Sequence, residues 1–301
     1  MAEIKRIRLD WGDEKRDDLP SSVVVKRPVE GSAADAWVAA SGNMSEEERA
    51  EKLEKAAKQM KRVQELCHLM ESQVYGLFDG EDHPIPMPKT YASFGLDSPH
   101  PAIVMEDITN AQIYDIVDGF TEKQIYTILD GIVNLHVMSY SSKKWHSMAI
   151  GFAYMTASFI PPLIKAFPSH AEILQKCADN ITHNVDWFIG YYAEDFLRLT
   201  VLGMPVAQRK ATKEKMMKWY HAQLTERLAA KGLTAPFTYE EYLDLYKKNL
   251  PYTVGMNLFA FSMWSNSSVL KKGNEEDGKR IGEMFDRVMS LCEEIVEAYG
   301  W

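Results

Sequence analysis

Apolar and charged side chains alternate along residues 4–11, IKRIRLDW, as they do in a strand with one buried face. A polar connection, GDEKRDDLP, separates this stretch from SVVVKRP (22–28), a β-branched run that ends at Pro28. The segments KTYASFG (89–95) and PAIVMED (101–107) have the same character. We therefore expect a small antiparallel sheet of short strands in the N-terminal third.

The pattern changes to a helical period between residues 45 and 79. Ser45 and Glu48 fit a capping box, in which each side chain bonds the other's backbone amide. The apolar positions that follow at helical spacing are Leu53, Ala57, Met60, Val63, Leu66, Met70 and Val74. The sequence predicts one long helix here, or two in succession.

The remainder of the chain is mostly helical in pattern. Thr121 and Gln124 form a second capping box, before a helix whose apolar face is Ile125, Ile128, Leu129, Ile132 and Leu135. Further helical patterns cover residues 171–200, 210–231, 238–248, 253–264 and 277–299. The apolar stretch 148–160 is shorter than the roughly 18 to 20 residues that cross a bilayer, so we interpret it as a buried helix. The predicted fold class is α+β, with a small lobe over residues 1–108 and a larger helical lobe over 109–301.

Composition narrows the possible partners and the compartment. The formal net charge of -9 argues against a surface that neutralises nucleic-acid phosphates. The three cysteines, Cys67, Cys177 and Cys292, are far apart, so they indicate neither a disulfide framework nor a zinc site. The N-terminus has no apolar stretch of the secretory kind. We expect a protein of the reducing cytosol with no membrane span and no nucleic-acid partner.

Three candidate features occur in a suggestive order. Lys26 ends a predicted buried strand, Glu71 lies on the long helix, and residues 102–108, AIVMEDI, form an apolar strand that leads into acidic residues. A strand lysine can neutralise phosphate oxygens and a glutamate can orient it. Taken singly, each has an ordinary structural explanation, namely a solvated lysine, an exposed helical charge and a strand that ends in a turn. Their order is the layout of a kinase-like N-terminal lobe.

Several stretches carry a longer pattern: LDW, LPSSVVVKRP, HLMESQVYGLF, IPMPKTYAS, AIVMEDI, LDGIVNLHVMSY, AEDFLRL and PFTYEEYLDLY. Together they make the chain resemble the CHK or ecdysteroid-kinase-like family, which has the aminoglycoside-phosphotransferase and choline-kinase type of protein-kinase-like fold. The resemblance runs from about residue 5 to 265. It implies transfer of phosphate from ATP, with magnesium, to a hydroxyl group of a small molecule.

The resemblance also implies roles for particular residues. Lys26 would contact the ATP phosphates and Glu71 would hold it. The segment Met105, Glu106 and Asp107 would lie beside the adenine, where main-chain groups could bond the purine.

Two acidic residues are carried over from the second half of the family pattern. Asp186, in the sequence VDW, would match the family's magnesium-binding aspartate. Asp195, in AEDFLRL, would match a structural acidic residue that anchors the helical lobe.

Two parts of the family's machinery have no counterpart. We expect no phosphate-covering loop, because the chain begins at the strand that this loop precedes in the family. The sequence also lacks a His-Gly-Asp catalytic loop, whose aspartate would be the base. Asp179 and Asn184 have the right spacing for such a loop, but Asp186 follows Asn184 too closely and the stretch continues a helix. We therefore expect the loop to be deleted near residues 178–186, and no catalytic base is assigned.

The sequence leaves three functions open. The first is a small-molecule phosphotransferase that is impaired or inactive in this form, with a sterol, a choline-like compound or another small alcohol as acceptor. The second is a module that binds a nucleotide or small ligand without turnover, and the third is a helical interaction protein. The aromatic stretch NLFAFSMW (257–264) either lines an acceptor pocket or packs in the core.

Overall fold

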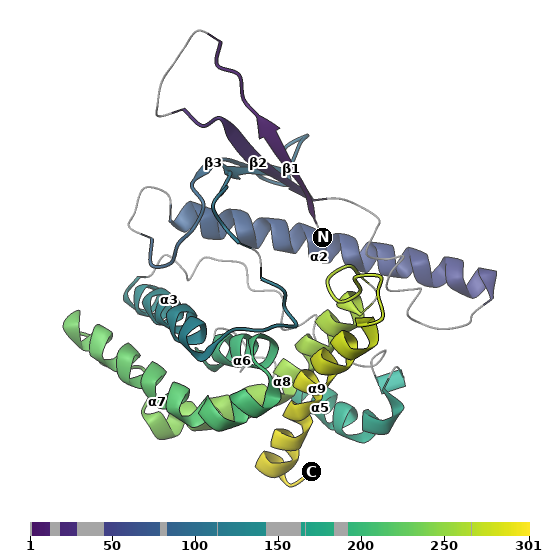
Figure 1. Ribbon diagram of the computed structural model, residues 1–301, viewed down its shortest axis with the longest axis vertical. Helices are drawn as coiled ribbons and strands as arrows, with labels where there is room; N and C mark the ends of the chain where they lie inside the picture. Colours follow the sequence, from purple (N-terminus) through teal and green to yellow (C-terminus); the bar gives the residue numbers. More distant parts are fainter. Residues whose placement is uncertain are drawn as a thin grey trace. The chain divides into compact units, whose positions relative to one another are not determined.

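A computed structural model describes residues 2–12, 19–28, 45–78, 83–112, 114–142, 164–165, 167–183, 192–265 and 267–301. These residues fall in two compact units, one that ends at residue 112 and one that begins at residue 114 (Figure 1). The first holds a sheet and a long helix, and the second is helical. The predicted α+β class is confirmed. The predicted helix over residues 148–160 lies outside the described residues.

The first unit contains one antiparallel sheet. Its strands are β1 (Ala2–Arg8), β2 (Ser22–Pro28), β3 (Thr90–Phe94) and β4 (Ala102–Glu106). They lie in the order β1-β2-β4-β3, so the buried strand β4 is central beside β2. Just beyond the paired ends of β1 and β2, the Trp11 indole donates to the Pro20 carbonyl over 2.8 Å. All four predicted strands are present.

Helix α2 (Glu46–Leu77) is one long helix of the first unit. The capping box of Ser45 and Glu48 is present at its start, as predicted. The half that begins near Val63 is more buried and contacts β2 and β3. The buried His68 side chain bonds the Phe94 carbonyl through Nε2 over 2.9 Å. This bond fixes how α2 is rotated against the sheet.

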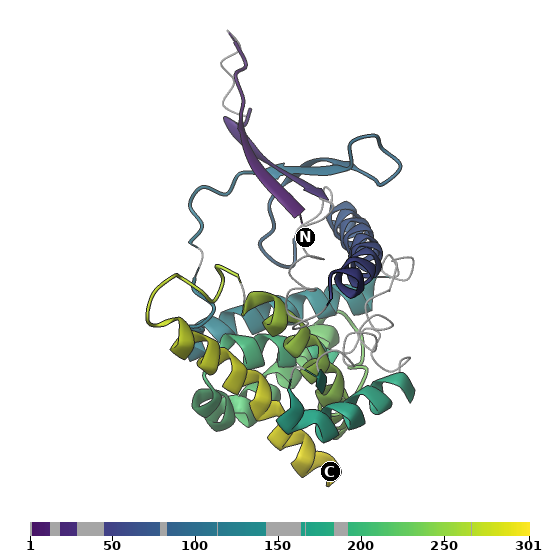
Figure 2. The same ribbon diagram turned by 90° about the vertical axis from the view of Figure 1, so that its right-hand side faces the viewer.

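The second unit is built from helices (Figure 2). They are α3 (Glu122–Ser141), the short 3-10 helix η2 (Pro168–His170), α5 (Ala171–His183), α6 (Tyr192–Gly203), α7 (Val206–Ala230), α8 (Tyr239–Trp264) and α9 (Asp277–Tyr299). Most of the unit's buried apolar side chains form one large cluster, and Phe261, Leu270 and Met284 form a smaller one. Helix α8 packs against α5, α6 and α9 and forms the middle of the unit. The capping box at Thr121 is also present. None of the described helices is long and apolar enough to cross a membrane.

The predicted break between residues 248 and 253 is wrong, because α8 continues through Pro251. A proline has no N–H, so the carbonyl four residues earlier loses its helical donor. In this protein the Tyr299 hydroxyl donates to that carbonyl, on Lys247, over 3.1 Å. The C-terminal helix α9 therefore supplies the hydrogen bond that Pro251 removes.

Candidate functional site

Lys26 on β2 and Glu71 on α2 form the central contact of the candidate site. The Lys26 Nζ atom lies 2.7 Å from Oε1 and 2.6 Å from Oε2 of Glu71. The side chains of Lys26 and Glu71 are 30% and 27% exposed. The structure thus brings these two predicted residues together, although their contact with a nucleotide stays a prediction. An ammonium has three donors, so at least one remains for a further acceptor.

The orientation of Glu71 follows from the packing of α2. His68 and Glu71 are three residues apart and so lie on the same side of the helix. Because His68 is bonded to β3, that side faces the sheet, and Glu71 reaches Lys26 on β2. Lys26 itself pairs across the sheet with Ile103 of β4 and Ile4 of β1.

The last residues of β4 are bonded to the segment that leads into β3. Met105 is buried, and the Glu106 amide donates to the Lys89 carbonyl over 2.8 Å. The Glu106 carboxylate accepts from the Lys89 amide over 3.1 Å. The amide of Glu106 is therefore already bonded. A purine at this segment would have to use other main-chain groups.

Asp107 joins the ends of three strands. Its carboxylate accepts from the Ser22 hydroxyl over 2.6 Å and from Arg6 Nε over 2.7 Å, and it is only 4% exposed. The bond from Ser22 lowers the pKa of Asp107, burial opposes this shift, and Arg6 adds to the lowering. The side chain of Asp107 is thus a structural clamp, whereas its position beside adenine stays a prediction.

Asp186, the predicted metal ligand, lies outside the described residues, as does Asn184. Asp179 lies on α5, where its carboxylate accepts from Gln175 over 2.9 Å, so the stretch that holds it continues a helix, as expected from the sequence. Among the described residues, no group of three or more His, Cys, Asp or Glu side chains is placed to hold a metal ion.

Asp195 participates in a polar chain that the sequence did not predict. Its Oδ2 atom lies 2.9 Å from Nε2 of the buried His136, whose Nδ1 lies 2.6 Å from the Tyr220 hydroxyl. The His136 ring also meets Tyr192 edge to face at 4.6 Å between centroids. Burial raises the pKa of Tyr220 well above its usual value, so this hydroxyl stays protonated. The contacts connect α3, α6 and α7, and they support the anchoring role that the resemblance implies for Asp195.

His136 had a signal in the sequence. It lies on the same face of α3 as Ile125, Leu129 and Val133, all of which are buried. A histidine on an apolar helix face must find hydrogen-bond partners in the core. The partners themselves could not be named, since they lie on other helices.

The chain matches one family model over nearly its whole length. The family is described as uncharacterized oxidoreductase dhs-27, and the matched residues are 1–186 and 185–300. Neither a curated protein nor a solved structure matches the chain.

Proposed function

Since the chain belongs to the family described as uncharacterized oxidoreductase dhs-27, we propose its function from its own geometry, as a nucleotide-binding protein of the ecdysteroid-kinase-like type. The observation that carries this proposal is the two-point ion pair between Lys26 and Glu71. Such a pair orients the phosphate-binding lysine of kinase-like enzymes. The order of strand lysine, helix glutamate and apolar strand β4 adds support.

The nucleotide would be held chiefly by the first unit. Lys26 has a donor left for a phosphate oxygen, and Met105 to Asp107 would lie beside the adenine. When bound, ATP and magnesium would supply the transferable phosphate and its charge neutralisation. Asp186 would contribute to the metal site, a role that rests on the resemblance alone.

Catalysis by this form is proposed to be impaired. A His-Gly-Asp loop is absent from the sequence, and no other base is assigned. The two ranges of the family match meet at residues 185–186, within the region where we expect a deleted loop. A positioned acid or base contributes about 10² to 10⁴ in rate. We expect binding of Mg-ATP with at most slow phosphate transfer to a small alcohol.

The description of the family names an oxidoreductase, an activity for which the fold offers little support. Dinucleotide-binding dehydrogenases use a parallel sheet and a Gly-x-Gly-x-x-Gly turn. The sheet that the structure describes is antiparallel throughout. The sequence also contains no Gly-x-Gly-x-x-Gly.

Thermal unfolding with millimolar Mg-ATP tests the proposal. A ligand at about 100 times its dissociation constant adds roughly 2.7 kcal/mol to stability. We expect a clear rise in Tm for the wild type and a greatly reduced rise for Lys26→Met. The matched control is Lys55→Met, since Lys55 pairs with Glu51 on the exposed part of α2.

Three results would decide between the candidate functions. If the wild type melts cooperatively and Mg-ATP does not shift it, the nucleotide proposal is wrong and an interaction protein becomes the better candidate. If Lys26→Met and Lys55→Met respond alike, Lys26 is not the phosphate contact. A shift with NADH or NADPH instead of ATP would favour the oxidoreductase.

A further inference from the structure

A cavity of about 300 Å³ lies inside the helical unit, between residues 114–120 and α6. Its apolar walls come mainly from Ile116, Phe120, Leu199 and Leu202. This volume is at the lower end of the roughly 300–1,000 Å³ that ligand pockets span. The cavity is therefore large enough for a small ligand with an apolar body.

The segment that forms one wall is fixed to α6 by its backbone. The Phe120 amide donates to the Gly203 carbonyl over 2.6 Å. Gly119 has a φ of 70°, and a Cβ atom there would lie 2.9 Å from the same Gly203 oxygen. Glycine is thus required by both its conformation and this close approach.

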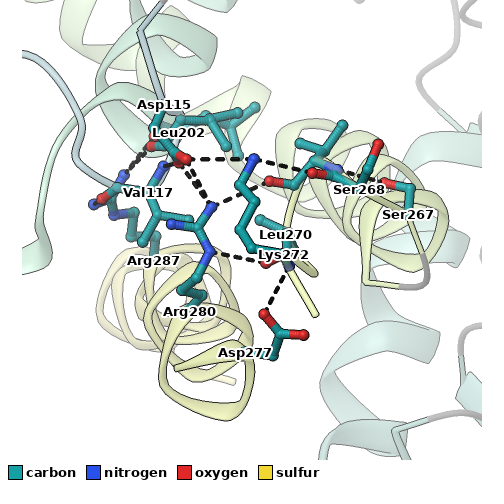
Figure 3. A network of polar contacts seen from close by, with 12 residues as sticks. Asp115, Val117, Leu202, Ser267, Ser268, Leu270, Lys272, Asp277, Arg280 and Arg287 are labelled. Carbon is teal, nitrogen blue, oxygen red and sulfur yellow. Dashed lines mark hydrogen bonds and ion pairs between the residues drawn. The ribbon is translucent and has the colours of Figure 1, made fainter. Parts of the chain in front are cut away.

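Polar contacts fix the same segment to α9 (Figure 3). Arg280 Nη2 donates to both oxygens of Asp115 over 2.8 and 2.9 Å, and Lys272 Nζ lies 3.5 Å from Oδ2. The buried Arg287 donates from Nη1 to the carbonyls of Ile116 and Leu202 over 3.0 and 2.8 Å. Walls held at this many points give a pocket that is formed before a ligand arrives.

The free hydrogen-bond donors at the cavity belong to Arg198. Asp115 also lines the cavity, but its carboxylate is neutralised by Arg280 and Lys272. Arg198 also lines the cavity; it forms an ion pair through Nε with Glu194 over 2.9 Å and is 43% exposed. Its two Nη groups have no partner among the described residues. A guanidinium with free Nη donors binds carboxylate, sulfonate or phosphate oxygens.

We propose that this cavity binds a small anionic amphiphile, with its apolar body between Phe120, Leu199 and Leu202 and its acidic head on Arg198. The closest simple example is a medium-chain carboxylate. The proposed ligand site lies wholly in the helical unit. It does not depend on nucleotide binding by Lys26.

Calorimetric titration with three probes separates binding of the apolar body from binding of the acidic head. Each probe is used at a concentration below that at which it aggregates. Decanoate carries both head and body, decanol carries the body alone, and acetate carries the head alone. We expect the wild type to bind decanoate at least tenfold more tightly than decanol, and acetate too weakly to measure.

Two variants and one control complete the test. Arg198→Leu should weaken decanoate binding at least tenfold and leave decanol binding unchanged, whereas Leu202→Trp should fill the cavity and remove both. Arg62→Leu, an exposed arginine of α2, should change nothing. Arg198→Leu leaves Glu194 without its ion partner, so a cooperative melt checks that this variant and Leu202→Trp both fold. Failure of the wild type to bind decanoate, or equal decanoate binding by wild type and Arg198→Leu, would overturn the proposal.

Discussion

Lys26 and Glu71, which are 45 residues apart in the chain, meet with the lysine Nζ within 2.7 Å of both carboxylate oxygens. About 30% of each side chain remains exposed. Partly exposed ion pairs typically stabilise a fold by only 0 to about 1 kcal/mol. Stability alone therefore gives little reason for the pair, and the proposed function assigns it the role of holding the ammonium in one position.

The first prediction distinguishes a role of the pair in nucleotide binding from a role in stability. Lys26→Met and Glu71→Gln should each change the free energy of unfolding by less than about 1 kcal/mol without ligand. Both should greatly reduce the Tm rise with Mg-ATP, and the double variant should lose little more than either single variant. Urea unfolding and thermal melts measure the two effects. A large loss of stability in the absence of ATP would instead assign the pair a structural role.

The second prediction concerns Asp107, whose carboxylate ties Ser22 and Arg6 to the end of β4. Asp107→Asn should lower the Tm of the first unit at pH 7. A neutral amide cannot replace the charge-assisted bonds that the carboxylate accepts from Ser22 and Arg6. The pKa of Asp107 is lowered in the folded state from 3.8, so its contribution is present above that value and is lost as pH falls through the folded pKa. The difference between variant and wild type should therefore shrink in strong acid. Asp97→Asn, in the exposed turn before β4, is the control and should show no such difference.

The third prediction concerns the buried ion pair of Arg209 and Glu294. Arg209 is 1% exposed and bonds Glu294 and Ser290, and the Glu294 carboxylate also accepts from Lys213 and Tyr246 over 2.7 and 2.8 Å. Glu294→Gln should cost about 3–5 kcal/mol, since it leaves the arginine charge buried without its counterion. Glu293→Gln is the control, because that neighbour pairs with Lys210 at the surface. Urea unfolding at pH 7 measures the free energy of unfolding of both variants. A similar loss of stability in Glu294→Gln and Glu293→Gln would contradict the prediction.

The same cluster predicts a pH dependence. Burial alone would raise the pKa of Glu294, but Arg209, Lys213 and Tyr246 outweigh it and hold the pKa below 4.5. A lowered folded pKa means that the stabilisation is present above pH 4.5 and is lost as pH falls through the folded value. The wild type should lose stability over this range more steeply than Glu294→Gln.

Local patterns predicted much of the fold because strands and capping boxes depend on neighbouring residues. The boxes at Ser45 and Thr121 are examples. The continuity of α8 through Pro251 was missed, since the donor to Lys247 comes from Tyr299, 52 residues away. Sequence reasoning had no means to pair them.

In the candidate site, too, the sequence predicted some contacts and missed others. The order of motifs suggested that Lys26 and Glu71 meet, because strand and helix carry one residue each toward the other. The bonds of Asp107 to Arg6 and Ser22 depend on strand register, and those of His136 cross 59 and 84 residues to Asp195 and Tyr220. Such long-range partners follow from tertiary packing, which periodicity does not encode.

The centre of the buried face of α8 becomes polar over two turns. Asn249, Thr253 and Asn257 follow at intervals of four residues, and all three are buried. The Asn249 Oδ1, Thr253 Oγ1 and Asn257 Nδ2 atoms have no hydrogen-bond partner among the residues that the structure describes. A buried polar atom without a partner costs about 1–3 kcal/mol, whereas an apolar group of the same shape does not.

The last prediction follows from this stripe. Thr253→Val should leave stability unchanged or raise it by up to about 1–3 kcal/mol, since it removes an unpaired hydroxyl without changing the shape of the side chain. Thr200→Val is the matched control, because the buried Thr200 hydroxyl donates to the Phe196 carbonyl over 2.9 Å. That variant should cost about 0.5–1.5 kcal/mol. Urea unfolding of both variants measures the contrast. If Thr253→Val destabilises the protein as much as Thr200→Val, the Thr253 hydroxyl has a partner in solution, and an ordered water is the simplest one.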